Sequence, residues 1–240
     1  MVAVASIELT SYQSRVTAER IEWVSKTVGA RSYLEIGVFD GQTFTNVALP
    51  RKVAVDPNFR FDWQRFQTGG VTLHPVTSDA FFAKGPREVF DVIFIDGLHT
   101  FAQSFRDFCA TTALAHDRTV WLIDDTVPDD AFSMVPDQGL AQHLRRLHGL
   151  TGRSWHGDVF RTAFAIHDFF PTMEMRTITD LGNPQTLVVR KPRAEFAPRW
   201  NDLEKIGRLE FAEFHANRDC MMPCTEAEAK AWLNAVFDGR

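Results

Sequence analysis

Two carboxylates and two glycines alternate in one short segment, in an order that suits ligand binding. Glu35, Gly37, Asp40 and Gly41 follow one another closely, and Asp56 ends a second short apolar run. Apolar runs that end at an acid or a glycine turn are typical of a nucleotide-type site at the carboxyl end of a parallel sheet. Glycine lets the backbone approach a ligand closely, and Asp56 can accept hydrogen bonds from both hydroxyls of a ribose.

The spacing of the glycines indicates which nucleotide is expected. A dinucleotide site needs the pattern G-x-G-x-x-G, because a pyrophosphate binds at a helix N-terminus. This chain has Gly37-x-x-x-Gly41 instead, with Glu35 before the turn and Asp40 inside it. Two carboxylates would repel a pyrophosphate but suit a ligand with a ribose and a positively charged head. S-adenosylmethionine is such a ligand, and we expect it as the cofactor.

Composition narrows the class of protein. The chain has 240 residues, of which 45% are hydrophobic, and this is enough for one sizeable core. A net charge of −5 disfavours a nucleic-acid partner bound through bulk positive charge. No apolar run approaches the roughly 20 residues of a membrane span, and the N-terminus lacks the pattern of a signal peptide. Three cysteines fit a reducing, cytoplasmic setting.

Short β-like runs alternate with helical segments, and this alternation predicts an α/β fold. Two β-like runs near the end are joined by a turn that contains Gly182 and Pro184, which indicates a hairpin. We therefore expect a Rossmann-like, seven-stranded mixed sheet with the last strand antiparallel and helices on both faces. The expected strands are 33–38, 52–55, 71–74, 90–95, 119–123, 175–179 and 185–190. The expected helices are 8–28, 42–49, 61–67, 101–114, 138–147 and 160–169.

One domain, residues 1–240, is expected, with three parts. These are an N-terminal helical cap (1–29), a Rossmann-like core (30–192) and a helical C-terminal extension (193–240).

The chain resembles the class I S-adenosylmethionine-dependent methyltransferases over roughly residues 30–192. The resemblance is carried by the segments 34–43, 55–57, 90–99 and 122–126. Within this class the chain is most similar to small-molecule O-methyltransferases that act on sugars, macrolides and other natural products. The resemblance implies methyl transfer to a hydroxyl group of a small molecule, a sugar or a secondary metabolite.

The resemblance also implies cofactor contacts. Glu35 and Gly37 would lie under the methionine part of S-adenosylmethionine, and Asp56 would bind the ribose hydroxyls. Ser78 and Asp79 stand where the family contacts the adenine. An alternative for these last two residues is that they cap the helix that follows them.

Three carboxylates form a second group. Asp96, Asp124 and Asp125 follow the ends of two strands that are neighbours in this fold, so they would share one rim. Carboxylates in such proximity are unfavourable unless they are protonated, solvated or bound to a cation, and Mg²⁺ prefers oxygen ligands. The metal-dependent O-methyltransferases have acids at these positions. Alternatively, Asp124 and Asp125 cap the next turn, while Asp96 contacts the ammonium group of the cofactor.

His99 stands three residues after Asp96, before an expected helix. A neutral imidazole can take a proton from a hydroxyl group, so His99 is a candidate base, or a support for the metal site. It is also consistent with a residue that only hydrogen-bonds to the backbone at the start of the helix.

The segment Trp155–Phe160 also resembles a stretch of the sugar-type subgroup. Within it, His156 and Asp158 are interpreted as a lid or a substrate contact, with ordinary loop residues as the alternative. Cys220 and Cys224 lack a second ligand pair and do not indicate zinc.

Two other functions stay open. A nicotinamide-dependent oxidoreductase is disfavoured by the missing third glycine, and a catalytically inactive cofactor-binding protein of the same fold by the complete acid and glycine set. The sequence leaves open whether the chain forms a homo-oligomer.

Overall fold

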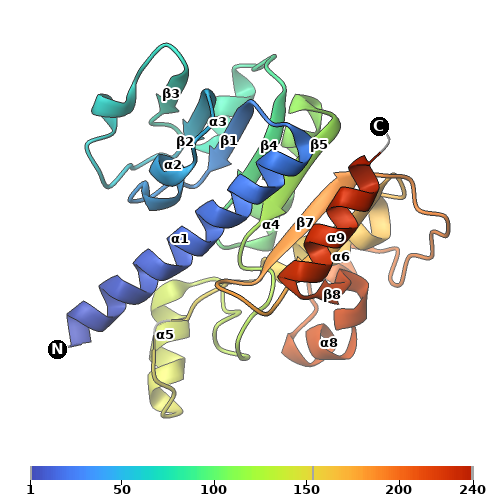
Figure 1. Ribbon diagram of the computed structural model, residues 1–240. Helices are drawn as coiled ribbons and strands as arrows, with labels where there is room; N and C mark the ends of the chain where they lie inside the picture. The colour runs from blue at the N-terminus through green and yellow to red at the C-terminus, as the bar shows by residue number, and fades with distance from the viewer. Residues whose placement is uncertain (1, 153, 239–240) are drawn as a thin grey trace.

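A single mixed sheet forms the centre of the molecule (Figure 1). The computed structural model describes residues 2–152 and 154–238. Its strands are β1 (Ser32–Ile36), β2 (Arg51–Val55), β3 (Val71–His74), β4 (Phe90–Ile95), β5 (Ala115–Ile123), β6 (Met173–Ile178), β7 (Gln185–Arg190) and β8 (Pro223–Cys224). Their order in the sheet is β3-β2-β1-β4-β5-β7-β6-β8.

The direction of the strands confirms the mixed sheet. The pairs among β1 to β5 are parallel, whereas β7 runs antiparallel to both β5 and β6. The predicted number of seven strands is wrong, because β8 adds an eighth strand that pairs with β6 in parallel. A strand of two residues, one of them proline, is too short to carry an alternating hydrophobic pattern, so the sequence did not indicate it.

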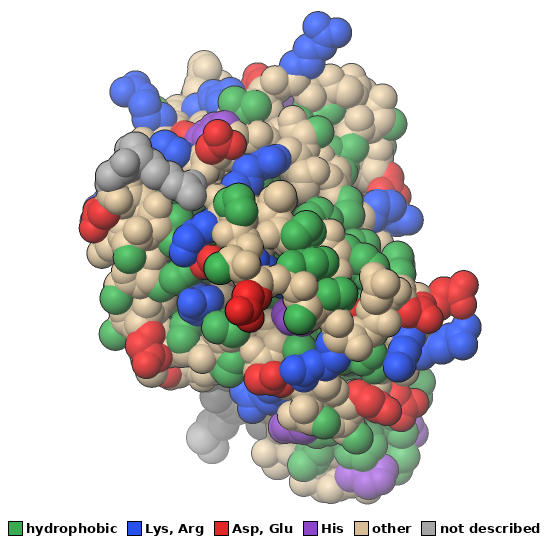
Figure 2. All heavy atoms as spheres, turned by 90° about the vertical axis from the view of Figure 1, so that its right-hand side faces the viewer, with side chains coloured by type: hydrophobic (Ala, Val, Ile, Leu, Met, Phe, Trp, Pro, Cys, Tyr) green, Lys and Arg blue, Asp and Glu red, His purple; other side chains and the backbone are tan. Residues whose placement is uncertain are grey.

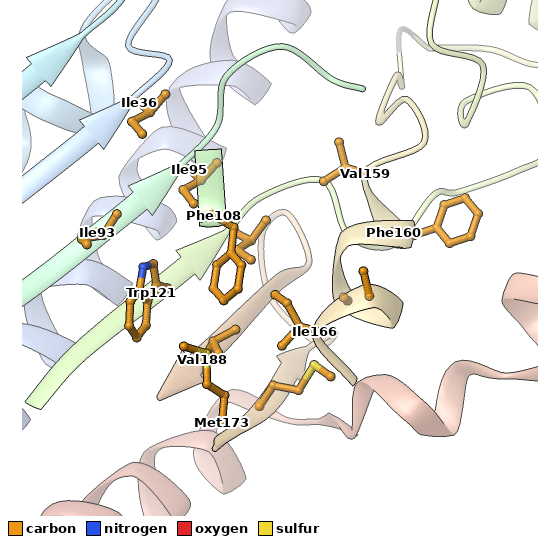
Figure 3. Packing of buried hydrophobic residues seen from close by; sticks show 14 of the residues in the cluster. Ile36, Ile93, Ile95, Phe108, Trp121, Val159, Phe160, Ile166, Met173 and Val188 are labelled. Carbon is orange, nitrogen blue, oxygen red and sulfur yellow. The ribbon is translucent and has the colours of Figure 1, made fainter. Parts of the chain in front are cut away.

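Alternating side chains of the strands form two cores, one on each face of the sheet. In β4, Val92 and Phe94 face one core, while Ile93 and Ile95 face the other. This follows from the two-residue period of a strand. Figure 3 shows the second core, in which Trp121 and other side chains of the sheet meet side chains of the covering helices.

Helices cover both faces, as expected. The face of the sheet that carries Val92 and Phe94 is covered by α1 (Val2–Val28), α2 (Gln42–Asn46) and α9 (Glu226–Phe237). On this face α1 lies beside α9 (Figure 1). The other face carries α3 (Ser78–Ala83), α4 (Phe101–Thr111), α6 (Phe160–Phe169), α7 (Leu203–Ile206) and α8 (Phe211–Ala216). Helix α5 (Gln138–Leu147) lies in the connection between β5 and α6. The expected helix at 61–67 is a 3-10 helix, Trp63–Phe66.

The part of the chain that the structure describes contains no helix with both the length and the apolarity of a membrane span.

An aromatic cluster attaches the C-terminal extension to the domain. Phe214 of α8 is fully buried, and its ring centroid lies 5.3 Å from that of Phe160 on α6 and 6.0 Å from that of Phe211. Burial of apolar surface against α6 therefore stabilises the position of α8.

A buried carboxyl group lies under the first β-turn-α unit. Glu35 of β1 is 1% exposed, and its Oε2 accepts a hydrogen bond from the Tyr33 hydroxyl at 2.6 Å. Burial raises the pKa of Glu35 to about 8, while the Tyr33 hydrogen bond and the charge of Lys52 act in the opposite direction. Burial therefore favours the neutral form of Glu35.

Truncation of Phe214 tests the attachment of α8. We expect Phe214→Ala to lower the free energy of unfolding by about 3–5 kcal/mol in urea denaturation, because it leaves a cavity in a closed core. The matched control is Phe196→Ala, since Phe196 is 40% exposed, and its loss should cost less than about 1 kcal/mol. Equal losses in the two variants would contradict the proposed packing.

Substitution of Glu35 tests its neutral state. A carboxyl whose folded pKa lies above the ordinary 4.5 contributes stability below pH 4.5 that is lost as the pH rises to about 8. Between pH 5 and 8 the wild type should therefore lose up to about 1.4 kcal/mol per pH unit relative to Glu35→Gln, which has no proton to lose. Parallel pH profiles of unfolding for the two proteins would show that Glu35 is charged in the folded state.

Candidate active site

The carboxyl ends of four parallel strands meet in one row, because the sheet hydrogen bonds continue one residue beyond each strand. The N–H of Gly37 donates to the carbonyl of Val55 at 2.9 Å, and the N–H of Asp96 donates to that of Ile36 at 2.8 Å. The N–H of Asp124 likewise donates to the carbonyl of Ile95, at 3.0 Å. The turn after β1 and the acids after β4 and β5 therefore share one rim, as expected.

The two glycines of the first turn are required by sterics. Gly37 has φ 82°, and a Cβ atom there would lie 2.0 Å from the carbonyl oxygen of Asp96. Gly41 has φ 76°, and a Cβ atom there would lie 2.7 Å from the Phe61 ring. Gly37 therefore brings the turn directly against the end of β4.

Asp56 holds this turn. Its Oδ2 accepts the N–H groups of Val38 at 2.8 Å and Phe39 at 2.9 Å, and its Oδ1 accepts that of Asn58 at 2.7 Å. A carboxylate offers about four acceptor positions, so about one stays available for a ligand hydroxyl. Phe39 is thereby held at φ 48°, with its side chain 65% exposed.

Glu35 lies beneath the turn, with its carboxyl in the buried layer next to Tyr33. The sequence argument counted Glu35 as charged, whereas its burial in the structure favours the neutral form. Asp40 is the half-buried acid of the turn, and it accepts hydrogen bonds from Gln42.

Ser78 and Asp79 begin α3 but do not cap it. The N-cap is Thr77, whose hydroxyl accepts the N–H of Ala80 at 3.2 Å, so the capping alternative is wrong. The side-chain amide of Gln103 on α4 donates to Ser78 at 3.0 Å and to Asp79 at 3.3 Å. The two residues therefore belong to a polar network at the start of α3.

Two carboxylates and an imidazole converge after β4 and β5. Nε2 of His99 lies 3.0 Å from Oδ2 of Asp125 and 3.7 Å from Oδ1 of Asp96. One ligand atom from each of the three lies within 4.8 Å of the others, a spacing that suits a metal ion. We call Asp96, His99 and Asp125 the acid–imidazole cluster.

Asp124 has a different role in this arrangement. Its Oδ1 accepts the amide of Asn183 at 2.5 Å, and its Oδ2 accepts that of Gln185 at 3.1 Å. Burial, and then the charge of Asp125, raise the pKa of Asp124 to about 7. The structure therefore separates Asp124 from the acid–imidazole cluster and places His99 beside the two other predicted ligands.

Crowding of carboxylates makes the cluster receptive to positive charge. Removal from water, together with the neighbouring charges of Asp124 and Asp125, raises the pKa of Asp96 well above its usual range. A divalent cation or a protonated His99 would relieve this repulsion. Two carboxylates fit Mg²⁺ or Mn²⁺, and the imidazole fits Mn²⁺ better than Mg²⁺.

The Trp155–Asp158 segment determines the position of His99. The two rings stack with centroids 4.2 Å apart at 14°, and Nδ1 of His99 lies 3.3 Å from the carbonyl oxygen of Trp155. A carbonyl only accepts, so Nδ1 carries a proton and Nε2 is the nitrogen that faces the acids. Asp158 accepts the N–H of Phe101 at 2.6 Å, at the start of α4. Asp158 therefore makes a structural contact here, and a lid or substrate contact stays a prediction.

Comparison with known proteins agrees with this geometry. Residues 34–126 match a family model described as a methyltransferase domain. No curated protein matches the sequence. Among solved structures, the O-methyltransferase from Bacillus cereus in complex with SAH is 18% identical, with a TM-score of 0.52 over 73% of this chain and 81% of that one.

Two further structures share the fold. The plantazolicin methyltransferase BpumL in complex with SAH is 11% identical, with a TM-score of 0.53 over 76% of this chain and 85% of that one. Cofactor-bound Rv0187 from MTB is 15% identical, with a TM-score of 0.52 over 80% of this chain and 90% of that one. At identities this low, the structural similarity shows the fold alone, and the family match covers residues 34–126. The chain therefore has the fold of these methyltransferases, and its residues 34–126 match the methyltransferase domain model.

Proposed function

We propose that the chain transfers the methyl group of S-adenosylmethionine to a hydroxyl group of a small molecule, a sugar or a glycosylated metabolite. The observation that carries this proposal is His99, whose free nitrogen faces two carboxylates on the same rim as the glycine turn. A hydroxyl group is a poor nucleophile at neutral pH, so its methylation needs a base or a metal ion. This rim offers candidates for both.

The turn after β1 supports the choice of cofactor. The close approach of Gly37 to the end of β4 leaves the turn free of side chains at that point, and Asp56 retains an acceptor for a ribose hydroxyl. Two of the structures that share this fold are complexes with SAH, the product form of S-adenosylmethionine. We assign the methionine part of the cofactor to the Gly37–Gly41 turn and the adenine to the region of Ser78 and Asp79.

The chemistry of the transfer is an in-line displacement. The acceptor oxygen forms a bond to the methyl carbon as the carbon–sulfur bond breaks, and S-adenosylhomocysteine leaves with the sulfur's electron pair. The hydroxyl proton goes to Nε2 of His99. Trp155 keeps the imidazole in the tautomer that leaves this nitrogen free. Asp125 stabilises the imidazolium that forms, since its Oδ2 is 3.0 Å away.

Asp96 and Asp125 would hold a divalent cation at the acid–imidazole cluster, completed by water. Such an ion lowers the pKa of an acceptor hydroxyl that binds to it. The two residues fit this role because their carboxylates converge, whereas Asp124 has both oxygens engaged by amides.

The rim and the surface support a small, uncharged acceptor. Phe39, in the turn after β1, and Leu98, between Asp96 and His99, are 65% and 60% exposed, so the rim has apolar side chains beside its acids. Basic and acidic side chains are interspersed on the face seen in Figure 2, and the net charge is −5. Both observations disfavour a nucleic acid as the acceptor.

Removal of Asp56 tests the cofactor assignment. We expect Asp56→Ala to weaken S-adenosylmethionine binding by about 1.5–3 kcal/mol for each charge-assisted hydrogen bond lost, measured by calorimetry. Asp62→Ala is the matched control, because Asp62 is exposed and pairs only locally with Arg65. Unchanged affinity in Asp56→Ala would remove the basis for this site.

The acid–imidazole cluster is tested by metal removal and substitution together. With a panel of sugars and glycosides, release of S-adenosylhomocysteine should stop in EDTA and return on addition of Mg²⁺ or Mn²⁺. His99→Ala should lower kcat by about 10²–10⁴-fold, whereas His143→Ala, an exposed histidine on α5, should leave it unchanged. Activity that survives EDTA but falls in His99→Ala would remove the metal and retain the base. Activity that survives both would make the cluster structural.

A further inference from the structure

The connection between β6 and β7 lies beside the acids that follow β5, because the start of β7 pairs with the end of β5. We infer that Asn183, in this connection, is a positioning residue that selects Asp125 rather than Asp124 as the carboxylate presented to a divalent cation. This inference rests on the proposed function.

The side-chain amide of Asn183 bonds to both acids, and we call this pair of hydrogen bonds the clamp. Its Nδ2 donates to Oδ1 of Asp124 at 2.5 Å and to Oδ1 of Asp125 at 3.0 Å. Asp125 has φ 57°, an unfavourable backbone conformation for a residue other than glycine, and such conformations persist where surrounding contacts hold them. The clamp is one such contact, and it leaves Oδ2 of Asp125 facing His99.

Gln185 completes the engagement of Asp124. Its Nε2 donates to Oδ2 of Asp124 at 3.1 Å and to the hydroxyl of Thr17 on α1 at 2.9 Å. The N–H of Asp125 adds a further hydrogen bond to Oδ1 of Asp124 at 2.8 Å. Both oxygens of Asp124 therefore accept amide hydrogen bonds, whereas Oδ2 of Asp125 faces His99 in the cluster.

The buried guanidinium of Arg20 on α1 forms several hydrogen bonds to this connection and to the start of β7. Arg20 of α1 is fully buried, and it donates to the carbonyl of Leu181 at 2.8 Å, the carbonyl of Asn183 at 3.0 Å and Oε1 of Gln185 at 2.6 Å. It also pairs with Glu226 of α9 at 3.3 Å. A planar fork with five donors suits this set of acceptors better than an ammonium group does.

Helices α1 and α9 therefore meet, through Arg20 and Glu226, next to the connection that holds Asn183. Arg20 fixes the backbone of Asn183 and the side-chain oxygen of Gln185, so that the nitrogens of both amides face the acids. Donors arranged around carboxylates in this way orient them for a cation, and their loss typically weakens metal binding 10–100-fold.

The test is the affinity of the full chain for Mn²⁺, measured by electron paramagnetic resonance, beside its affinity for S-adenosylhomocysteine. We expect Asn183→Ala to weaken Mn²⁺ binding about 10–100-fold and to change S-adenosylhomocysteine binding less than about twofold. Asn234→Ala is the matched control, because the exposed Asn234 side chain on α9 accepts a hydrogen bond from Thr27 and lies outside the β6–β7 connection. Arg20→Lys should weaken Mn²⁺ binding in the same direction, since an ammonium group cannot span the acceptors.

Each other outcome counts against the inference. Unchanged or tighter Mn²⁺ binding in Asn183→Ala would overturn it, because the clamp would then have no role or would compete with the ion. An equal loss of both ligands would make Asn183 a residue of general folding and also overturn it. A wild type that binds no Mn²⁺ contradicts the metal part of the proposed function and this inference with it, which separates that failure from the failure of Asn183 alone.

Discussion

The close approach of Gly37 to the backbone of Asp96 is the constraint on which the rest of the site depends. Sheet hydrogen bonds extend one residue beyond β1, β4 and β5, so the turn and the acids cannot move apart without breaking the sheet. A side chain at position 37 would collide with the carbonyl of Asp96. This contact places the glycine turn beside carboxylates, and methyl transfer to a nucleophile needs reacting groups held close together.

The same arrangement crowds carboxylates on one rim, where their charges repel. Amides, an imidazole and a guanidinium near the carboxylates reduce this repulsion. Amide donors saturate Asp124, while His99 faces Asp125 and Asp96. Arg20 supplies buried positive charge from α1, where Asp124 and Glu226 favour its charged form against burial. The N-terminal helix and the C-terminal extension are therefore connected to the candidate chemistry and are not mere coverings of the sheet.

Much of the fold could be predicted from the sequence, because apolar runs and glycine turns are local signals. The strands β1 to β7 and the shared rim of Gly37, Asp96 and Asp125 follow from them. The sequence could not separate Asp124 from Asp125, since the difference arises from Asn183, almost sixty residues away. It also treated Glu35 as charged, because burial is a property of the folded chain. The role of Trp155 depends on a tertiary stack that no spacing reveals.

The central claim is that cofactor and cation bind side by side on this rim. The most direct measurement is a crystal structure of the chain with S-adenosylhomocysteine and Mn²⁺, with anomalous scattering used to locate the metal ion. The account predicts S-adenosylhomocysteine over the Gly37–Gly41 turn, and an anomalous peak coordinated by Asp96 and Asp125 with Asp124 outside its ligands. An anomalous peak elsewhere, or none while S-adenosylhomocysteine is bound, would contradict the cation site. S-adenosylhomocysteine bound away from the turn would contradict the account as a whole.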